Sequence, residues 1–418
     1  MSAFWALPQT LKGFVSSKVI KDDMNICEVL DIPDIVLAFK SKIEIVIQYF
    51  QKHIKELFDI CFDDSNGDYS IVALRILIQL DNPLAQVIVD KDILDSVFNE
   101  LYEIGNHVLI GRFASVMTCI LSSNCHMEEK KICFVPKILE FGYVLDVFYM
   151  FKSFFTNHEK FVSIRCHLQS FDFPSLFINQ IVTAQDEEMQ VCMLNLIRYS
   201  LYSQLYQEGF QNKNIVLFLK TMECFGEYSE DAKWSAIESM CENSSPLLCI
   251  PFLDDSLTII SNAKNVRPKV VYAINVAKCL IQTNPNILNQ NLLHDLYNLL
   301  YNNPMHSILL ASIYHFLSTA IGLVGVDTQI ALFFIPSLIK EASERENGLL
   351  GAFSMRLLMK IDKQKSQSRY LDHVLSQLGG YESFVQNEMK EYRQIIESDY
   401  GGKAAASIFD YIKNFIKG

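Results

Sequence analysis

Short amphipathic segments with helical periodicity, separated by recurring breakers, follow one another along almost the whole chain of 418 residues. One of the clearest, from Ile35 to Phe50, keeps its apolar residues on one helical face, and Asp34 is its expected N-cap. Breakers such as Asn302-Asn303-Pro304 and Gly379-Gly380 lie at the joints. Because a single amphipathic helix cannot bury its own apolar face, this pattern predicts helices stacked on one another.

The pattern predicts an all-α fold, a HEAT- or armadillo-like α-solenoid in which helix pairs form a right-handed superhelix. With 16 Gly and 11 Pro, the chain has too little turn chemistry for an all-β protein. We expect one elongated domain over residues 1–418, with loops at Asp63–Asp68 and Asp362–Arg369. Further helices are expected to begin near Ser70, Asp92, His107, Lys131, Phe173, Asp186, Asn212, Ser229, Pro268, Asn289, Ser307, Asp327, Gly348, Tyr381 and Gly402.

The charge of the chain argues against nucleic acid as a partner. The formal net charge is −12, and residues 181–260 hold 12 Asp and Glu against 4 Lys and Arg, which is −8 of that total. A chain without a basic stripe is a poor ligand for phosphate backbones. The acidic stretch is interpreted as a solvated helix face, and the alternative is a docking surface for a basic partner.

The 11 cysteines include no CxxC pair, which excludes zinc-ribbon and thioredoxin-like sites. Their scatter among apolar residues predicts free thiols and a reducing compartment, the cytosol and also the nucleus. No signal peptide is expected at the start of the sequence. The uncharged stretch from Leu296 to Val326 is long enough to raise a membrane alternative, but its two-sided pattern favours a buried helix over stable membrane insertion.

No catalytic residue, metal site or cofactor site is predicted. Gly105-Asn106-His107 resembles the start of the metal-binding GNHE motif of metallophosphatases, but Val108 stands where the motif has Glu, so a turn is expected there. The pairs Cys125-His126 and Cys166-His167 are interpreted as structural, because adjacent residues on a helix do not face each other.

Several blocks, in a single order along the chain, resemble the SAPS-domain family of regulatory subunits of protein phosphatase 6. The most specific match is Tyr301 to His306, which resembles the family's YxWNNFLH signature, although Pro304 replaces an aromatic residue. The other blocks are Phe4-Trp5, Glu28 to Phe50, Tyr69 to Leu101, Val144 to Phe151, Arg267 to Val271, Gly348 to Gly351 and Tyr381 to Val385. No counterpart of the family's long acidic tail is expected.

This resemblance implies a non-catalytic scaffold that holds a type-2A-like phosphatase catalytic subunit, and further scaffold proteins, and directs the phosphatase to substrates. The alternatives are a helical-repeat adaptor for a trafficking or transport client and, less favoured, a membrane-associated protein. The residues expected to contact a partner are Asn302, Asn303, His306, Arg267 and Trp5. For the first three the competing interpretation is structural, because Asn often caps helices and bonds turns. A competing role for Trp5 is to cover an open end of the helix stack.

Overall fold

The computed structural model shows helices joined by turns, with no strand among the residues it describes, and this confirms the all-α prediction for that part of the chain. The helices group into two compact units, residues 1–248 and residues 249–418. The described residues are 20–21, 23–91, 93–123, 133–155, 159–161, 164–165, 168, 171–203, 213–323, 326–344 and 348–397.

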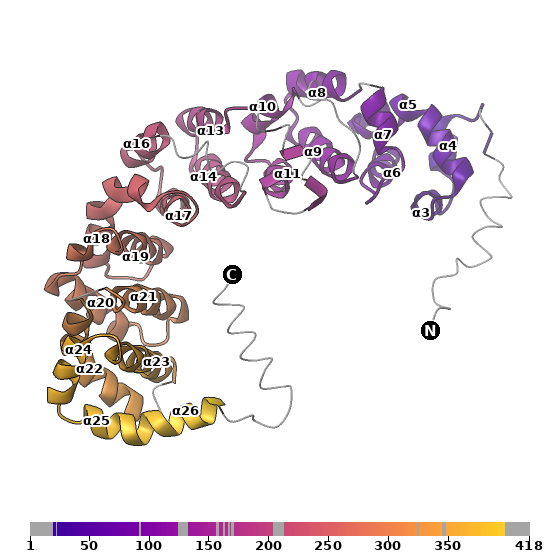
Figure 1. Ribbon diagram of the computed structural model, residues 1–418. Coiled ribbons are helices and arrows are strands. Elements are labelled where there is room, and N and C mark those ends of the chain that lie inside the picture. The colour runs from indigo at the N-terminus through magenta and orange to yellow at the C-terminus, as the bar shows by residue number, and fades with distance from the viewer. Residues whose placement is uncertain are drawn as a thin grey trace. The chain divides into compact units, whose positions relative to one another are not determined.

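In unit 1 the helices that follow the first three segments lie in two layers, and the chain passes back and forth between them (Figure 1). Layer 1 consists of α6 (Asp68–Leu77), α9 (His107–Ser122), α11 (Leu145–Phe155), α14 (Glu187–Tyr202) and α17 (Glu227–Asn243). Layer 2 consists of α5 (Ile54–Cys61), α7 (Ala85–Asp90), α8 (Ile93–Ile104), α10 (Val135–Ile138), α13 (Phe173–Val182) and α16 (Lys213–Thr221). The first three segments are α2 (Ile26–Leu30), α3 (Ile35–Lys40) and α4 (Glu44–Lys52).

Unit 2 repeats the two-layer arrangement (Figure 1). Layer 1 consists of α19 (Pro268–Ile281), α21 (Ser307–Ala320) and α23 (Gly348–Lys365), and layer 2 of α18 (Leu253–Ser261), α20 (Gln290–Asn302) and α22 (Val326–Ser343). The unit continues through α24 (Arg369–Gln377), α25 (Tyr381–Phe384), the π-helical turn η7 (Val385–Met389) and α26 (Lys390–Glu397). No helix in the described part of the chain is both long and apolar enough to cross a membrane.

Helix starts follow the capping chemistry of the sequence. Gly105 adopts a left-handed conformation with φ +67° and ends α8, and the Asn106 side chain then accepts hydrogen bonds from Val108 N and Leu109 N to begin α9. Glycine adopts positive φ without the penalty that a Cβ imposes, and asparagine is among the best N-caps. Gly105 and Asn106 therefore form the turn between α8 and α9 that the sequence predicts, and His107 is the first residue of α9.

Two expectations about helix boundaries are wrong. The run from Ile35 to Phe50 is two helices, α3 and α4, because the chain turns at Lys42, where φ is +55°. Asp34 also has a positive φ, and its side chain makes no capping hydrogen bond. The loop expected at Asp362–Arg369 is much shorter, because α23 continues to Lys365 and α24 already begins at Arg369.

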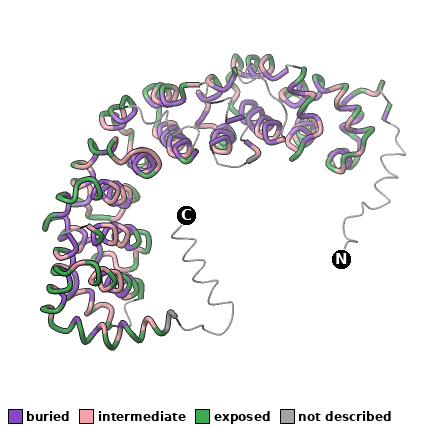
Figure 2. The backbone as a smooth tube through the Cα atoms, in the orientation of Figure 1, coloured by how far each residue is buried: buried purple, intermediate pink, exposed green. Residues whose placement is uncertain are grey.

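Layer 1 helices combine buried and half-buried residues along their length in both units, as the colouring of Figure 2 shows. In unit 1 the space between the layers is filled by a chain of phenylalanine rings with centroids 5.4 to 6.3 Å apart, which includes Phe151, Phe155, Phe173 and Phe177. In unit 2 the corresponding core is largely aliphatic. Such side chains each stabilise the fold by about 1.5–3 kcal/mol when buried.

Adjacent layer 1 helices of unit 1 are also joined by polar contacts at their N-termini. The Glu187 carboxylate, in the first turn of α14, accepts hydrogen bonds from Tyr228 N at 2.8 Å and Ser229 N at 3.0 Å, in the first turn of α17. These backbone N–H groups have no partner within their own helix. A Cβ at Gly226 would lie 2.6 Å from Glu187 Oε1, so glycine is required for this approach. One carboxylate of the acidic stretch 181–260 thus has a structural role.

We predict that Glu187→Ala lowers the free energy of unfolding by about 1–2 kcal/mol, as expected when an N-terminal cap is lost. Glu188→Ala is the matched control, because Glu188 is the next residue in the same first turn and is exposed. Chemical denaturation of the full chain, followed by circular dichroism, measures both variants. Equal destabilisation by the two substitutions would contradict the assigned role of Glu187.

Candidate interaction surface

The joint between α20 and α21 contains three of the residues expected to contact a partner. Asn303 Nδ2 donates a hydrogen bond to Leu299 O at 3.0 Å, and His306 Nδ1 accepts one from Leu309 N at 3.2 Å. Asn303 therefore closes the end of α20 and His306 begins α21. Asn302, the last residue of α20, is exposed. The structural interpretation accounts for Asn303 and His306, and Asn302 is available to a partner.

The same joint exposes two apolar side chains that the sequence did not single out. Met305 is 71% exposed and Ile308 is 55% exposed. A signal for Ile308 exists in the sequence, since it lies on the same helical face as Ser312 and His315, opposite the apolar face of α21. Exposed apolar side chains beside a rigid helix start are suited to protein contacts.

The N-terminal ends of α19, α21 and α23 share one edge of unit 2. These helices pack side by side within layer 1, and the chain returns through layer 2 between them, so they run in the same direction (Figure 1). Neighbouring packed helices lie about 8–10 Å apart. The ends carry a row of side chains that we call the unit 2 edge: Arg267, Met305, His306, Ile308 and Leu349.

The structure brings the predicted residue Arg267 into this row, as the half-buried N-cap of α19. Leu349, in the first turn of α23, is 42% exposed and extends the row by one helix. Trp5 lies outside the described residues. The unit 2 edge thus combines exposed apolar side chains with the guanidinium group of Arg267.

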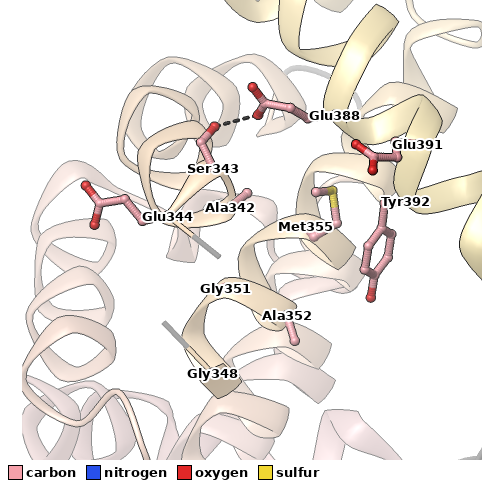
Figure 3. Close-up of a pocket in the computed structure, with 10 residues that line it drawn as sticks. All are labelled: Ala342, Ser343, Glu344, Gly348, Gly351, Ala352, Met355, Glu388, Glu391 and Tyr392. Carbon is pink, nitrogen blue, oxygen red and sulfur yellow. Dashed lines mark hydrogen bonds between the residues drawn. The ribbon is translucent and has the colours of Figure 1, made fainter. Parts of the chain in front are cut away.

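A pocket of about 320 Å³ lies near the Leu349 end of the row, where α22 ends and α23 begins (Figure 3). Gly348, Gly351 and Ala352 form one wall, and Tyr392 of α26 forms another. Glu388 accepts a 2.5 Å hydrogen bond from Ser343 Oγ, which ties η7 to the end of α22. Its described lining contains the carboxylates of Glu344, Glu388 and Glu391 and the hydroxyl groups of Ser343 and Tyr392, without a histidine, cysteine or lysine.

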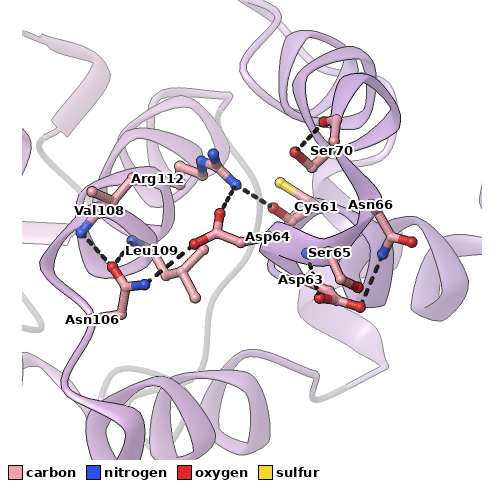
Figure 4. Close-up of polar contacts among 11 residues, drawn as sticks. Cys61, Asp63, Asp64, Ser65, Asn66, Ser70, Asn106, Val108, Leu109 and Arg112 are labelled. Atoms are coloured by element: carbon pink, nitrogen blue, oxygen red, sulfur yellow. Dashed lines mark hydrogen bonds and ion pairs between the residues drawn. The ribbon is translucent and has the colours of Figure 1, made fainter.

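Acidic side chains of the loop at Asp63–Asp68, beside Asn106, form contacts within the fold (Figure 4). Asp64 forms an ion pair with Arg112 at 3.1 Å and accepts a hydrogen bond from Asn106 Nδ2 at 3.3 Å. Arg112 also donates to Cys61 O, so the loop is joined to both α5 and α9. No group of three His, Cys, Asp or Glu residues in the described part of the chain is arranged to hold a metal ion. The pairs Cys125-His126 and Cys166-His167 lie outside the described residues.

Thiol chemistry is disfavoured at Cys61 and Cys192. Burial raises the pKa of Cys61 to about 12, and burial together with the nearby carboxylates of Glu188 and Asp186 raises the pKa of Cys192 to about 11. The thiolate is the nucleophilic form of cysteine. At neutral pH both groups are therefore protonated and poorly suited to nucleophilic catalysis.

Comparison of the chain with protein-family models, with curated proteins and with solved structures gives no match. The SAPS-domain resemblance therefore continues to depend on the ordered sequence blocks alone.

We predict that Cys61 resists alkylation by iodoacetamide at pH 8, while the exposed Cys133 reacts. With a pKa of about 12, roughly one Cys61 side chain in 10,000 is thiolate at this pH, and burial further restricts access. Peptide mass spectrometry of the native chain at timed intervals measures both residues. Alkylation of Cys61 as fast as Cys133 would overturn the assignment.

We also predict that His306→Ala lowers the free energy of unfolding by about 1 kcal/mol, because the first turn of α21 loses its side-chain cap. Asn302→Ala is the control and should change it by less than about 0.5 kcal/mol, as is usual for exposed positions. Thermal denaturation of the two variants distinguishes them. The capping assignment fails if Asn302→Ala is the more destabilising change.

Proposed function

We propose that the chain is a non-catalytic scaffold subunit that binds a type-2A-like serine/threonine phosphatase catalytic subunit, of the protein phosphatase 6 type, and directs it to substrates. The proposed architecture is a HEAT- or armadillo-like right-handed α-solenoid. Support for this architecture comes from the alternation of helices between two layers within each unit. Support for the phosphatase partner comes from the ordered sequence blocks that resemble the SAPS-domain family.

The observation that carries the binding role is the exposed pair Met305 and Ile308 on the unit 2 edge. Full burial of such a side chain contributes about 1.5–3 kcal/mol, so covering the exposed part of each contributes roughly 1–2 kcal/mol. Because His306 and Asn303 fix the surrounding backbone through their own hydrogen bonds, little conformational entropy is lost when a partner docks there. Tyr301 to His306, the block most similar to the family signature, lies at this same joint.

The proposal contains no catalytic step for the chain itself. Burial raises the pKa values of Cys61, Cys119, Cys192 and Cys224. The side chains of Asp64 and Asn106 are occupied by structural contacts. In this role the chain contributes affinity and orientation, while the bound phosphatase contributes the chemistry.

The test is affinity purification of the tagged full chain from its native cells, followed by mass spectrometry. We expect the wild-type chain to recover a type-2A-like catalytic subunit. The variant Met305→Glu combined with Ile308→Glu should reduce recovery about tenfold or more, because charged side chains disfavour an apolar contact.

Leu332→Glu is the matched control, since Leu332 is 57% exposed on α22, in the other layer of the same unit. It should leave recovery unchanged. Recovery of no phosphatase catalytic subunit would contradict the proposal, and consistent recovery of a transport or trafficking client instead would support the adaptor alternative. Equal loss in the edge and control variants would refute the role of the unit 2 edge.

A further inference from the structure

A second exposed surface, of different chemistry, lies on layer 1 of unit 1. Helices α11 and α14 pack against each other there. Leu145, Tyr149 and Lys152 occupy positions i, i+4 and i+7 of α11 and so lie on one face of that helix. Tyr199 reaches the same place from α14. We call these four residues the tyrosine–lysine patch.

Rings hold the lysine of this patch in place. Lys152 Nζ lies 5.4 Å from the centroid of the Tyr149 ring and 4.8 Å from that of Tyr199, within the range of cation–π attraction. Phe148 contacts both tyrosine rings edge-on, at 5.7 and 6.1 Å between centroids. Contacts from two helices therefore restrict the motion of a side chain that is ordinarily flexible.

No carboxylate pairs with Lys152 among the described residues. Asp146, the acid of α11, lies on another face of the helix and accepts a hydrogen bond from Ser115 Oγ at 3.0 Å. Lys152 is thus half-buried, and its ammonium group lies beside two aromatic rings with no described carboxylate paired to it. A pre-positioned ammonium group binds an external anion at lower entropic cost than a mobile surface lysine does.

Apolar surface accompanies this charge. Leu145 is 65% exposed and Tyr149 is 51% exposed. Leu145 and Lys152 are seven residues apart on a helix, which places them about 10 Å apart along its axis. Tyrosine is among the residues that most often carry binding energy at protein interfaces. The patch thus presents an apolar end and a cationic end at a fixed separation.

We propose that the tyrosine–lysine patch binds an acidic segment of a partner protein. The segment places a carboxylate on Lys152 and a large apolar side chain against Leu145 and Tyr149. In an extended segment a separation of about 10 Å corresponds to three residues, so the recognised pattern is an apolar residue three positions from Asp or Glu. This surface belongs to unit 1, and the inference does not depend on the phosphatase proposal.

The experiment is selection of random 12-residue displayed peptides on the immobilised full chain, followed by fluorescence anisotropy with the enriched peptides. We expect enrichment of peptides with an apolar residue three positions from an acid. Lys152→Gln and Tyr149→Ala should each weaken binding about tenfold, the effect of losing one charge-assisted or aromatic contact. Circular dichroism of each variant verifies that it is folded.

Lys137→Gln is the matched control, because Lys137 lies 5.6 Å from the centroid of the Tyr102 ring elsewhere in unit 1. This variant should bind the peptides as tightly as wild type does. A charge swap gives the most direct comparison. The Lys152→Glu variant should no longer bind the acidic peptide and should bind the same peptide with its acidic residue changed to lysine.

Failure to enrich any peptide, enrichment of peptides without a carboxylate, or equal binding by the Lys152→Gln variant would each overturn the proposal. No phosphatase is present in this assay, so its outcome is separate from that of the affinity purification.

Discussion

The packing of neighbouring layer 1 helices against one another within each unit is the constraint on which the rest of that unit depends. Helix α9 illustrates it: beyond His107 and Val108 at its start, no residue of the helix is exposed. A helix buried to this extent requires neighbours on every side, so stability comes from stacking rather than from the helix alone. Such a layer leaves free the ends of its helices and, on helices such as α11, a narrow exposed stripe.

Both proposed binding surfaces follow from this constraint. The unit 2 edge uses helix ends, where capping by Asn303 and His306 fixes the backbone and Met305 and Ile308 remain exposed. The tyrosine–lysine patch uses the free stripe of α11 beside α14. The first surface is largely apolar and the second is aromatic and cationic, so they are suited to different partners.

The sequence predicted helix starts well where capping chemistry is local. Helices do begin at His107, Pro268 and Ser307, because Asn106, the proline itself and His306 act within one turn. The sequence prediction was wrong where a single backbone angle determines the structure. The positive φ of Lys42 divides a continuous apolar run into two helices. The alternation of layers was implied by amphipathicity, whereas the acceptor role of Glu187 across 41 residues was not.

The sequence predicted the location of the candidate site better than it predicted which residues are exposed there. Asn302, Asn303 and His306 do mark an exposed joint, but Asn303 and His306 form hydrogen bonds to their own helices. The exposed apolar residues beside them, Met305 and Ile308, had been interpreted as part of a hydrophobic run.

The central claim is that this joint contacts a type-2A-like phosphatase catalytic subunit. Hydrogen–deuterium exchange of the full chain, with and without the purified subunit, tests it most directly. The account predicts slower exchange at residues 303–309 and 348–352, and unchanged exchange at both segments in a formed complex would contradict it.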